Sequence, residues 1–125
     1  MKNILLVVAL SLTSGLAQAE LLAGDAERGR LAFGSCRSCH YPEKIVGHHN
    51  GPNLHGIFGR KAGSAEGYAY YSEEMKNAGF EWTPELLDFW LANPTRFLPN
   101  SAMIVFQTTP QQRADIIEYL KQFKD

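Results

Sequence analysis

Apolar residues at helical spacing dominate the end of the chain. Ile116 begins one stripe, which continues with Ile117, Leu120 and Phe123, and Tyr119 lies beside it. This stripe predicts an amphipathic helix that begins at Thr109-Pro110 and runs towards Phe123. A second apolar face, made of Leu86, Leu87, Trp90 and Leu91, predicts a helix from Thr83 to Ala92 that ends at Asn93-Pro94.

Two further helices are predicted nearer the N-terminus. Residues 24–33 form the first, with Asp25 as its N-cap. Gly29 lies in the middle of this segment and costs helix stability, which indicates that another helix crosses very closely there. Residues 72–79 predict a short capped helix that Gly79 ends.

The segment from Tyr41 to Tyr71 has no regular periodicity. It is interrupted by Gly47, Gly51, Pro52, Gly56, Gly59, Gly63 and Gly67. These residues predict a loop, and a loop of this length is uncommon in a compact domain unless it has a special role, such as wrapping a prosthetic group. Since no segment is typical of a strand, the predicted fold class is all-α.

Residues 1–19 are typical of a cleaved signal peptide. A basic start at Lys2 precedes an almost unbroken apolar run at 4–12, and Ala17-Gln18-Ala19 has the small residues of a cleavage site. The alternative is a retained membrane anchor, but this run is too short for a span of about 20 residues. We therefore expect residues 20–125 to be a single exported domain in the periplasm, without stable membrane insertion.

The charge of the chain is nearly balanced. It contains 12 basic and 13 acidic side chains, and removing Lys2 with the leader leaves 11 and 13, a net charge of −2. Such a chain is no polycation, which argues against nucleic acids and anionic membrane surfaces as partners.

The motif Cys36-Arg37-Ser38-Cys39-His40 is the attachment pattern of a c-type haem. Two thiols at this spacing can bond to the two vinyl groups on one edge of the macrocycle, and the adjacent imidazole can then ligate the iron. A disulfide or a thioredoxin-like redox pair is the alternative in an oxidising compartment, but the latter normally follows a strand. Zinc needs four ligands, and adjacent Cys39 and His40 are poorly placed to share one ion.

A second axial ligand is expected from the later part of the chain. Met103 lies in an irregular segment between the two late helices, and a thioether ligand raises the reduction potential of haem iron. A loop methionine is more often a gap-filler, so this assignment depends on the haem. His48, His49 and His55 follow His40 too closely to reach the opposite face with ease, and we interpret them as polar loop residues.

With these features the sequence resembles the class I cytochromes c of the mitochondrial and bacterial c2 type. The resemblance covers nearly the whole chain from Gly24 to about Lys124. Beyond the haem motif, the matching stretches are residues 51–61, Gly67-Tyr68-Ala69-Tyr70, Trp82, Asn93-Pro94, residues 99–103 and Tyr119-Leu120. The resemblance implies one covalently attached haem c, in a fold with crossing N- and C-terminal helices, further short helices and long loops.

The resemblance also implies roles for single residues. Cys36 and Cys39 form the thioether bonds, and His40 and Met103 are the axial ligands. The resemblance further implies that the carbonyl of Pro52 accepts the imidazole N–H. It places Tyr70 and Trp82 at a buried propionate, with Arg60 nearby. It places Ser101 at a propionate on the distal side. Gly29 and Phe33 pack against Ile116 and Tyr119, and His48 bridges two loops.

Two departures from the family pattern bear on function. Trp90 replaces a tyrosine whose hydroxyl meets the methionine sulfur in mitochondrial members, so its indole N–H is the candidate substitute and the local polarity differs. Arg96 and Ala102 stand at two places where those members carry lysines around the exposed haem edge. We therefore expect weak electrostatic steering towards acidic partners.

The function implied is that of a monomeric electron carrier with both axial positions filled, and not an enzyme. Its partners are redox proteins: a membrane cytochrome complex, a terminal oxidase or a periplasmic dehydrogenase. One alternative is a haem enzyme or gas sensor in which Met103 is labile, with peroxidase-like turnover. Another is a disulfide-stapled binding domain without haem.

Overall fold

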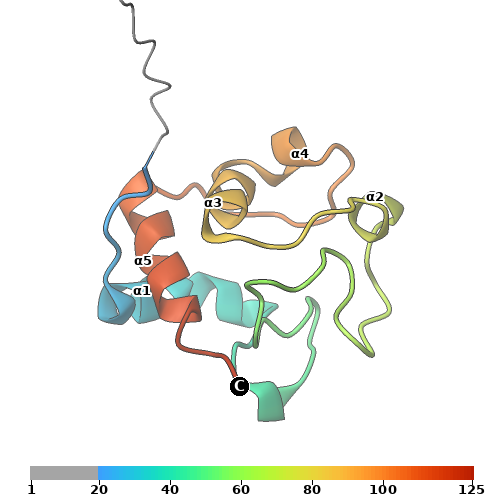
Figure 1. Cartoon of the computed structure of the whole chain (residues 1–125), viewed down its shortest axis with the longest axis horizontal. Coiled ribbons are helices and arrows are strands. Elements are labelled where there is room, and N and C mark those ends of the chain that lie inside the picture. Colours follow the sequence, from blue (N-terminus) through green and yellow to red (C-terminus); the bar gives the residue numbers. More distant parts are fainter. Residues whose placement is uncertain (1–19) are drawn as a thin grey trace, which may run out of the picture.

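The computed structural model describes residues 20–125, whose arrangement is shown in Figure 1. The predicted signal peptide at residues 1–19 lies outside the described residues. Among the described helices, none is both long and apolar enough to cross a membrane.

Helices and irregular segments make up the described chain. The α-helices are α1 (Ala26–Ala32), α2 (Glu73–Lys76), α3 (Pro84–Ala92), α4 (Pro94–Phe97) and α5 (Pro110–Leu120). Two 3-10 helices are present, η1 (Phe33–Ser38) and η2 (Lys44–Val46). Within residues 20–125 the only β-pairing is an isolated bridge between Lys61 and Glu81. The all-α fold class is confirmed.

α1 crosses α5, which brings the first and the last helix of the described chain into contact (Figure 1). Gly29 permits this close approach, because a Cβ atom added there would collide with the backbone carbonyl of Asp115. Beside it, the rings of Phe33 and Tyr119 pack with their centroids 5.5 Å apart. The interpretation of Gly29 as the mark of a close helix crossing is therefore correct.

Side-chain caps explain where the helices begin. Each cap accepts a backbone N–H three residues further on, and the caps are Asp25, Ser72, Thr83, Asn93 and Thr109. All except Asn93 lie at predicted helix starts.

Two helix boundaries differ from the sequence-based prediction. α2 ends at Lys76, before the expected stop at Gly79, because the backbone of Asn77 leaves the helical conformation, with φ −97° and ψ 4°. The short helix α4 was not predicted. Asn93 ends α3, and its side chain then accepts the N–H of Arg96 and starts a further turn.

The hydrophobic core lies where α3 and α5 meet the first part of the chain. Its main buried side chains are Phe33, Ile57, Trp82, Leu87, Trp90, Leu91, Ile116, Ile117, Tyr119 and Leu120. The predicted stripes of both late helices supply most of this set. Only Leu86 and Phe123, at the edges of those stripes, are partly buried.

Candidate haem-binding site

A large cavity opens beside this core. Its volume is about 420 Å³, within the range of ligand and cofactor sites. The walls come from η1, the irregular segment before α2, helices α2, α3 and α5, and residues 101–108. The lining is mostly apolar, and its side chains with a basic nitrogen are His40 and Arg60.

Cys36, Cys39 and His40 lie together on one wall of this cavity. The turn of η1 groups them, because the backbone N–H groups of Cys39 and His40 both bond to the carbonyl of Cys36, at 3.0 and 2.8 Å. Both thiols are free, and burial raises the pKa of the Cys36 thiol. The wall therefore presents two thiols and one imidazole from a single turn.

A hydrogen bond fixes the orientation of His40. Its Nδ1 lies 2.7 Å from the carbonyl oxygen of Pro52, a pure acceptor, so Nδ1 carries the proton and Nε2 keeps its lone pair. Burial lowers the pKa of His40 and favours the neutral imidazole, the form that binds metal. Gly51 leaves room for the ring, since a Cβ atom there would collide with it.

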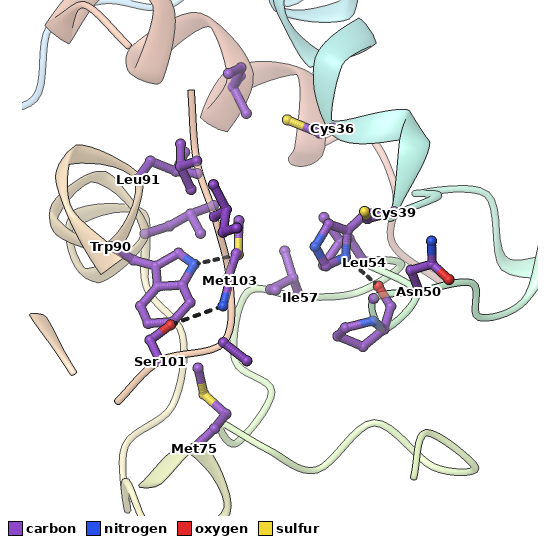
Figure 2. A pocket seen from close by; sticks show the side chains of 18 of the residues that line it. Cys36, Cys39, Asn50, Leu54, Ile57, Met75, Trp90, Leu91, Ser101 and Met103 are labelled. Atoms are coloured by element: carbon purple, nitrogen blue, oxygen red, sulfur yellow. Dashed lines mark hydrogen bonds between the residues drawn. The ribbon is translucent and has the colours of Figure 1, made fainter. Parts of the chain in front are cut away.

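Met103 lies on the opposite side of the cavity from the cysteines (Figure 2). The indole Nε1 of Trp90 is 3.1 Å from its Sδ. Its backbone N–H donates to the hydroxyl oxygen of Ser101 at 3.3 Å. An irregular segment thus holds one thioether in a defined place, with support from α3.

Three further predicted residues line the same cavity and offer hydrogen-bond donors. Arg60 is half-buried, donates only to the carbonyls of Asn53 and His55, and has no carboxylate partner among residues 20–125. Burial lowers its pKa, as expected for a guanidinium without a counter-charge. The indole N–H of buried Trp82 and the hydroxyl of exposed Tyr70 also find no protein acceptor within the described chain. These donors suit an anionic carboxylate.

The remaining histidines, His48, His49 and His55, do not line the cavity. His48 accepts the N–H of Asn53 at 2.9 Å and bonds to the carbonyl of Glu66 at 2.7 Å. The expected loop-bridging role of His48 is thus seen. His55 lies by the C-terminus, 3.3 Å from Asp125, and both histidines agree with their interpretation as polar loop residues.

Among the cavity residues that sequence reasoning missed are Met75 and Tyr71. Met75 is the third residue of the one-turn helix α2, and the sequence carried no signal for which face of so short a helix lies inwards. Figure 2 shows its side chain at the edge of the cavity. Tyr71 gave no signal either, and its hydroxyl accepts the N–H of Ala65 at 3.2 Å.

The residues present therefore fit a covalently attached haem. Two thiols and an oriented imidazole face a thioether across a mostly apolar cavity. Its lining also offers hydrogen-bond donors that suit the carboxylates of a haem. Together these define the class of haem proteins in which two cysteines and an adjacent histidine attach the group.

Comparisons with known proteins agree with this class. Residues 26–124 match the family model for cytochrome c. Cytochrome c of Ginkgo biloba is 42% identical over 101 residues, which are 79% of this chain and 88% of the relative. Cytochrome c of Chlamydomonas reinhardtii is 44% identical over 106 residues, 83% of this chain and 94% of the relative. The chain belongs to the cytochrome c family.

A solved structure supports the fold as well. Cytochrome cH from Methylobacterium extorquens superposes with a TM-score of 0.73 at 40% sequence identity, over 79% of this chain and 99% of that chain. Membership of the family means that the chain carries one covalent haem c, for which Cys36 and Cys39 form the attachment motif, and that it transfers electrons. It is an electron carrier and not an enzyme.

Proposed function

We propose that this chain is an exported, periplasmic single-haem electron carrier whose iron is ligated by His40 and Met103. The observation that carries the proposal is their placement on two sides of one cavity. Each is also held by a hydrogen bond, His40 by the Pro52 carbonyl at 2.7 Å and Met103 by the Trp90 indole at 3.1 Å. Such bonds orient a ligand before metal is bound.

Different residues of the chain would hold different parts of the haem. When bound, haem supplies a one-electron couple between ferric and ferrous iron. Cys36 and Cys39 would anchor it covalently, while Arg60, Trp82 and Tyr70 would hold one carboxylate and Ser101 would contact another. The apolar walls keep water away from the iron, which favours electron transfer over chemistry on a bound substrate.

The rival function is a haem enzyme or gas sensor with a labile sixth ligand. It would require Met103 to leave the iron readily. The two hydrogen bonds at Met103, from Trp90 to its sulfur and from its own N–H to Ser101, favour retention instead. A retained ligand leaves no position for oxygen, peroxide or carbon monoxide.

Export is supported by the signal peptide expected at residues 1–19 and by covalent haem attachment. The partners we propose are redox proteins on the same side of the membrane: a membrane cytochrome complex, a terminal oxidase or a periplasmic dehydrogenase. We further propose that the chain acts as a monomer.

Substitution of the two cavity methionines tests this proposal. Met103→Ala should abolish the absorption band from thioether to ferric iron and lower the midpoint potential sharply, because a soft ligand that favours ferrous iron is lost. Met75→Leu is the matched control, since Met75 lines the same cavity, and it should keep the band. If the wild type lacks the band, or if its ferrous form binds carbon monoxide readily at neutral pH, the proposed ligation is wrong.

A further inference from the structure

The proposed iron ligand Met103 belongs to a segment without regular structure, residues 102–108, called the ligand segment below. Among residues 20–125, none of its backbone N–H or carbonyl groups bonds to another backbone group. Two of its large side chains, Ile104 and Phe106, are 92% and 73% exposed. A segment with so few backbone hydrogen bonds and so little burial opens locally at a low cost in free energy. The contacts at its two ends therefore determine how firmly Met103 is held.

At the N-terminal end, the contacts are those of Met103 itself. Its sulfur accepts the indole N–H of Trp90, and its backbone N–H donates to the hydroxyl oxygen of Ser101. Neither hydrogen bond involves residues 104–108. Any restraint on the C-terminal half of the ligand segment must come from other residues.

Thr108 fixes the C-terminal end of the ligand segment. Its hydroxyl donates to the carbonyl of Leu91 in α3 at 3.2 Å. Its own carbonyl accepts a hydrogen bond from the Arg113 guanidinium, with Nη1 at 3.1 Å. The ligand segment is therefore bound to α3 directly and to α5 through Arg113.

Asp88 holds the guanidinium of Arg113 in place. The Nε atom of Arg113 lies 2.7 Å from Oδ1 of Asp88, and the two side chains are 13% and 21% exposed. A charge-assisted bond of this length, mostly shielded from solvent, is among the stronger polar contacts of a protein. One nitrogen of the guanidinium thus contacts a carboxylate of α3, while another contacts the Thr108 carbonyl, as the planar fork of an arginine allows.

We propose that Arg113 is a positioning residue for Met103. Oriented by Asp88, its guanidinium holds the Thr108 carbonyl and so limits how readily the ligand segment opens and Met103 leaves the iron. This inference rests on the proposed function, because it takes Met103 to be an axial ligand. It extends that function to a residue that does not line the cavity.

Added imidazole measures the opening. Imidazole can bind the ferric iron in place of Met103 only when the thioether has left, so its apparent affinity rises with the fraction of open molecules. Arg113→Lys is the decisive variant. The ammonium can keep the pair with Asp88, but it lacks the second nitrogen that reaches the Thr108 carbonyl. We expect imidazole to bind this ferric holoprotein about tenfold more tightly than wild type, the factor for one lost hydrogen bond from a charged group. Loss of the thioether band reports the binding.

A second variant and its matched control test the role of charge. Arg113→Gln loses both contacts and should bind imidazole at least as tightly as Arg113→Lys. Lys121→Gln removes the same charge at the end of the same helix and breaks an exposed ion pair with Glu118. It should keep the wild-type affinity for imidazole.

Denaturant unfolding of each holoprotein separates positioning from stability. If Arg113 only joined α3 to α5, Arg113→Lys would restore the wild-type affinity for imidazole together with the stability, and the proposal would be wrong. Equal imidazole affinities of Arg113→Gln and Lys121→Gln would also contradict it. If Arg113→Gln does not fold, Arg113→Lys decides alone. A wild type without the thioether band would instead contradict ligation by His40 and Met103, so the two failures are distinguishable.

Discussion

The indole of Trp90 donates its Nε1–H to the sulfur of Met103, with 3.1 Å between the two atoms. Trp90 is buried in α3, whereas Met103 belongs to the irregular segment that follows α4. The hydrogen bond therefore links the proposed ligand Met103 to helix α3. An indole is a donor only, so this contact persists at any pH at which the protein folds.

Trp90→Phe removes this donor and keeps an aromatic ring. We expect a loss of about 0.5–1.5 kcal/mol in the free energy of unfolding of the holoprotein. We also expect a lower midpoint potential, because the sulfur becomes a better electron donor and favours ferric iron. Denaturant unfolding and a redox titration measure the two effects. Trp90→Tyr, which returns a donor, should recover part of each, and an unchanged potential in the Phe variant would show that the bond has no influence on the iron.

None of the lysines among residues 20–125 lines the cavity. An amine that replaced Met103 at alkaline pH would have to come from elsewhere through a larger movement of the chain. We expect the thioether band of the ferric protein to persist as pH rises towards about 10, where lysines begin to deprotonate. A spectrophotometric pH titration checks this. Loss of the band well below that pH, prevented by Lys76→Ala, would show that Lys76 can reach the iron.

The sequence predicted the parts of this site that depend on local spacing. Cys36, Cys39 and His40 share one turn, and the caps at Asp25, Thr83 and Thr109 act within three residues, so each could be predicted from neighbours alone. The contact of His40 with Pro52 came from the family resemblance and not from spacing.

Other features depend on tertiary packing and were beyond prediction. α4 exists because one residue, Asn93, both ends a helix and caps the next. Met75 faces the cavity only because the short helix α2 lies against it. Whether Trp90 could reach the Met103 sulfur depended on how α3 and the late segment pack, which the sequence pattern does not specify.

The crossing of α1 and α5 makes two neighbouring glycines respond differently to alanine. Gly29→Ala places a Cβ atom against the Asp115 carbonyl, and backbone contacts of this kind cannot be relieved by a side-chain rotation. We expect a loss of about 3 kcal/mol in the free energy of unfolding, at the upper end of overpacking effects. Gly34→Ala is the control, because a Cβ atom there meets nothing within 4 Å. Thermal or denaturant unfolding compares them, and equal stability would contradict the close crossing.

Asp115 joins the same two helices through its carboxylate. Its side chain is 5% exposed and accepts from the Arg28 guanidinium at 2.9 Å, from the Asp25 N–H at 2.8 Å and from Gln111 at 3.0 Å. The Arg28 guanidinium, chiefly, holds the pKa of this carboxyl well below its usual range. The ionised form is therefore bound more strongly in the folded protein than in the unfolded chain.

Asp115→Asn should make the holoprotein less stable at neutral pH, and the deficit should shrink in acid. A carboxyl with a depressed pKa in the folded state contributes its full stability above its unfolded pKa, about 3.9, and loses it as pH falls towards the folded value. Denaturant unfolding of both proteins should thus show a similar stability difference at about pH 7 and 5, and a smaller one at about pH 3. Asp125→Asn is the control, because Asp125 also has a depressed pKa, through Lys44, but is 80% exposed. Solvent screens that pair, so its removal should change stability less at every pH, and a deficit of Asp115→Asn that grows in acid would contradict the assigned role.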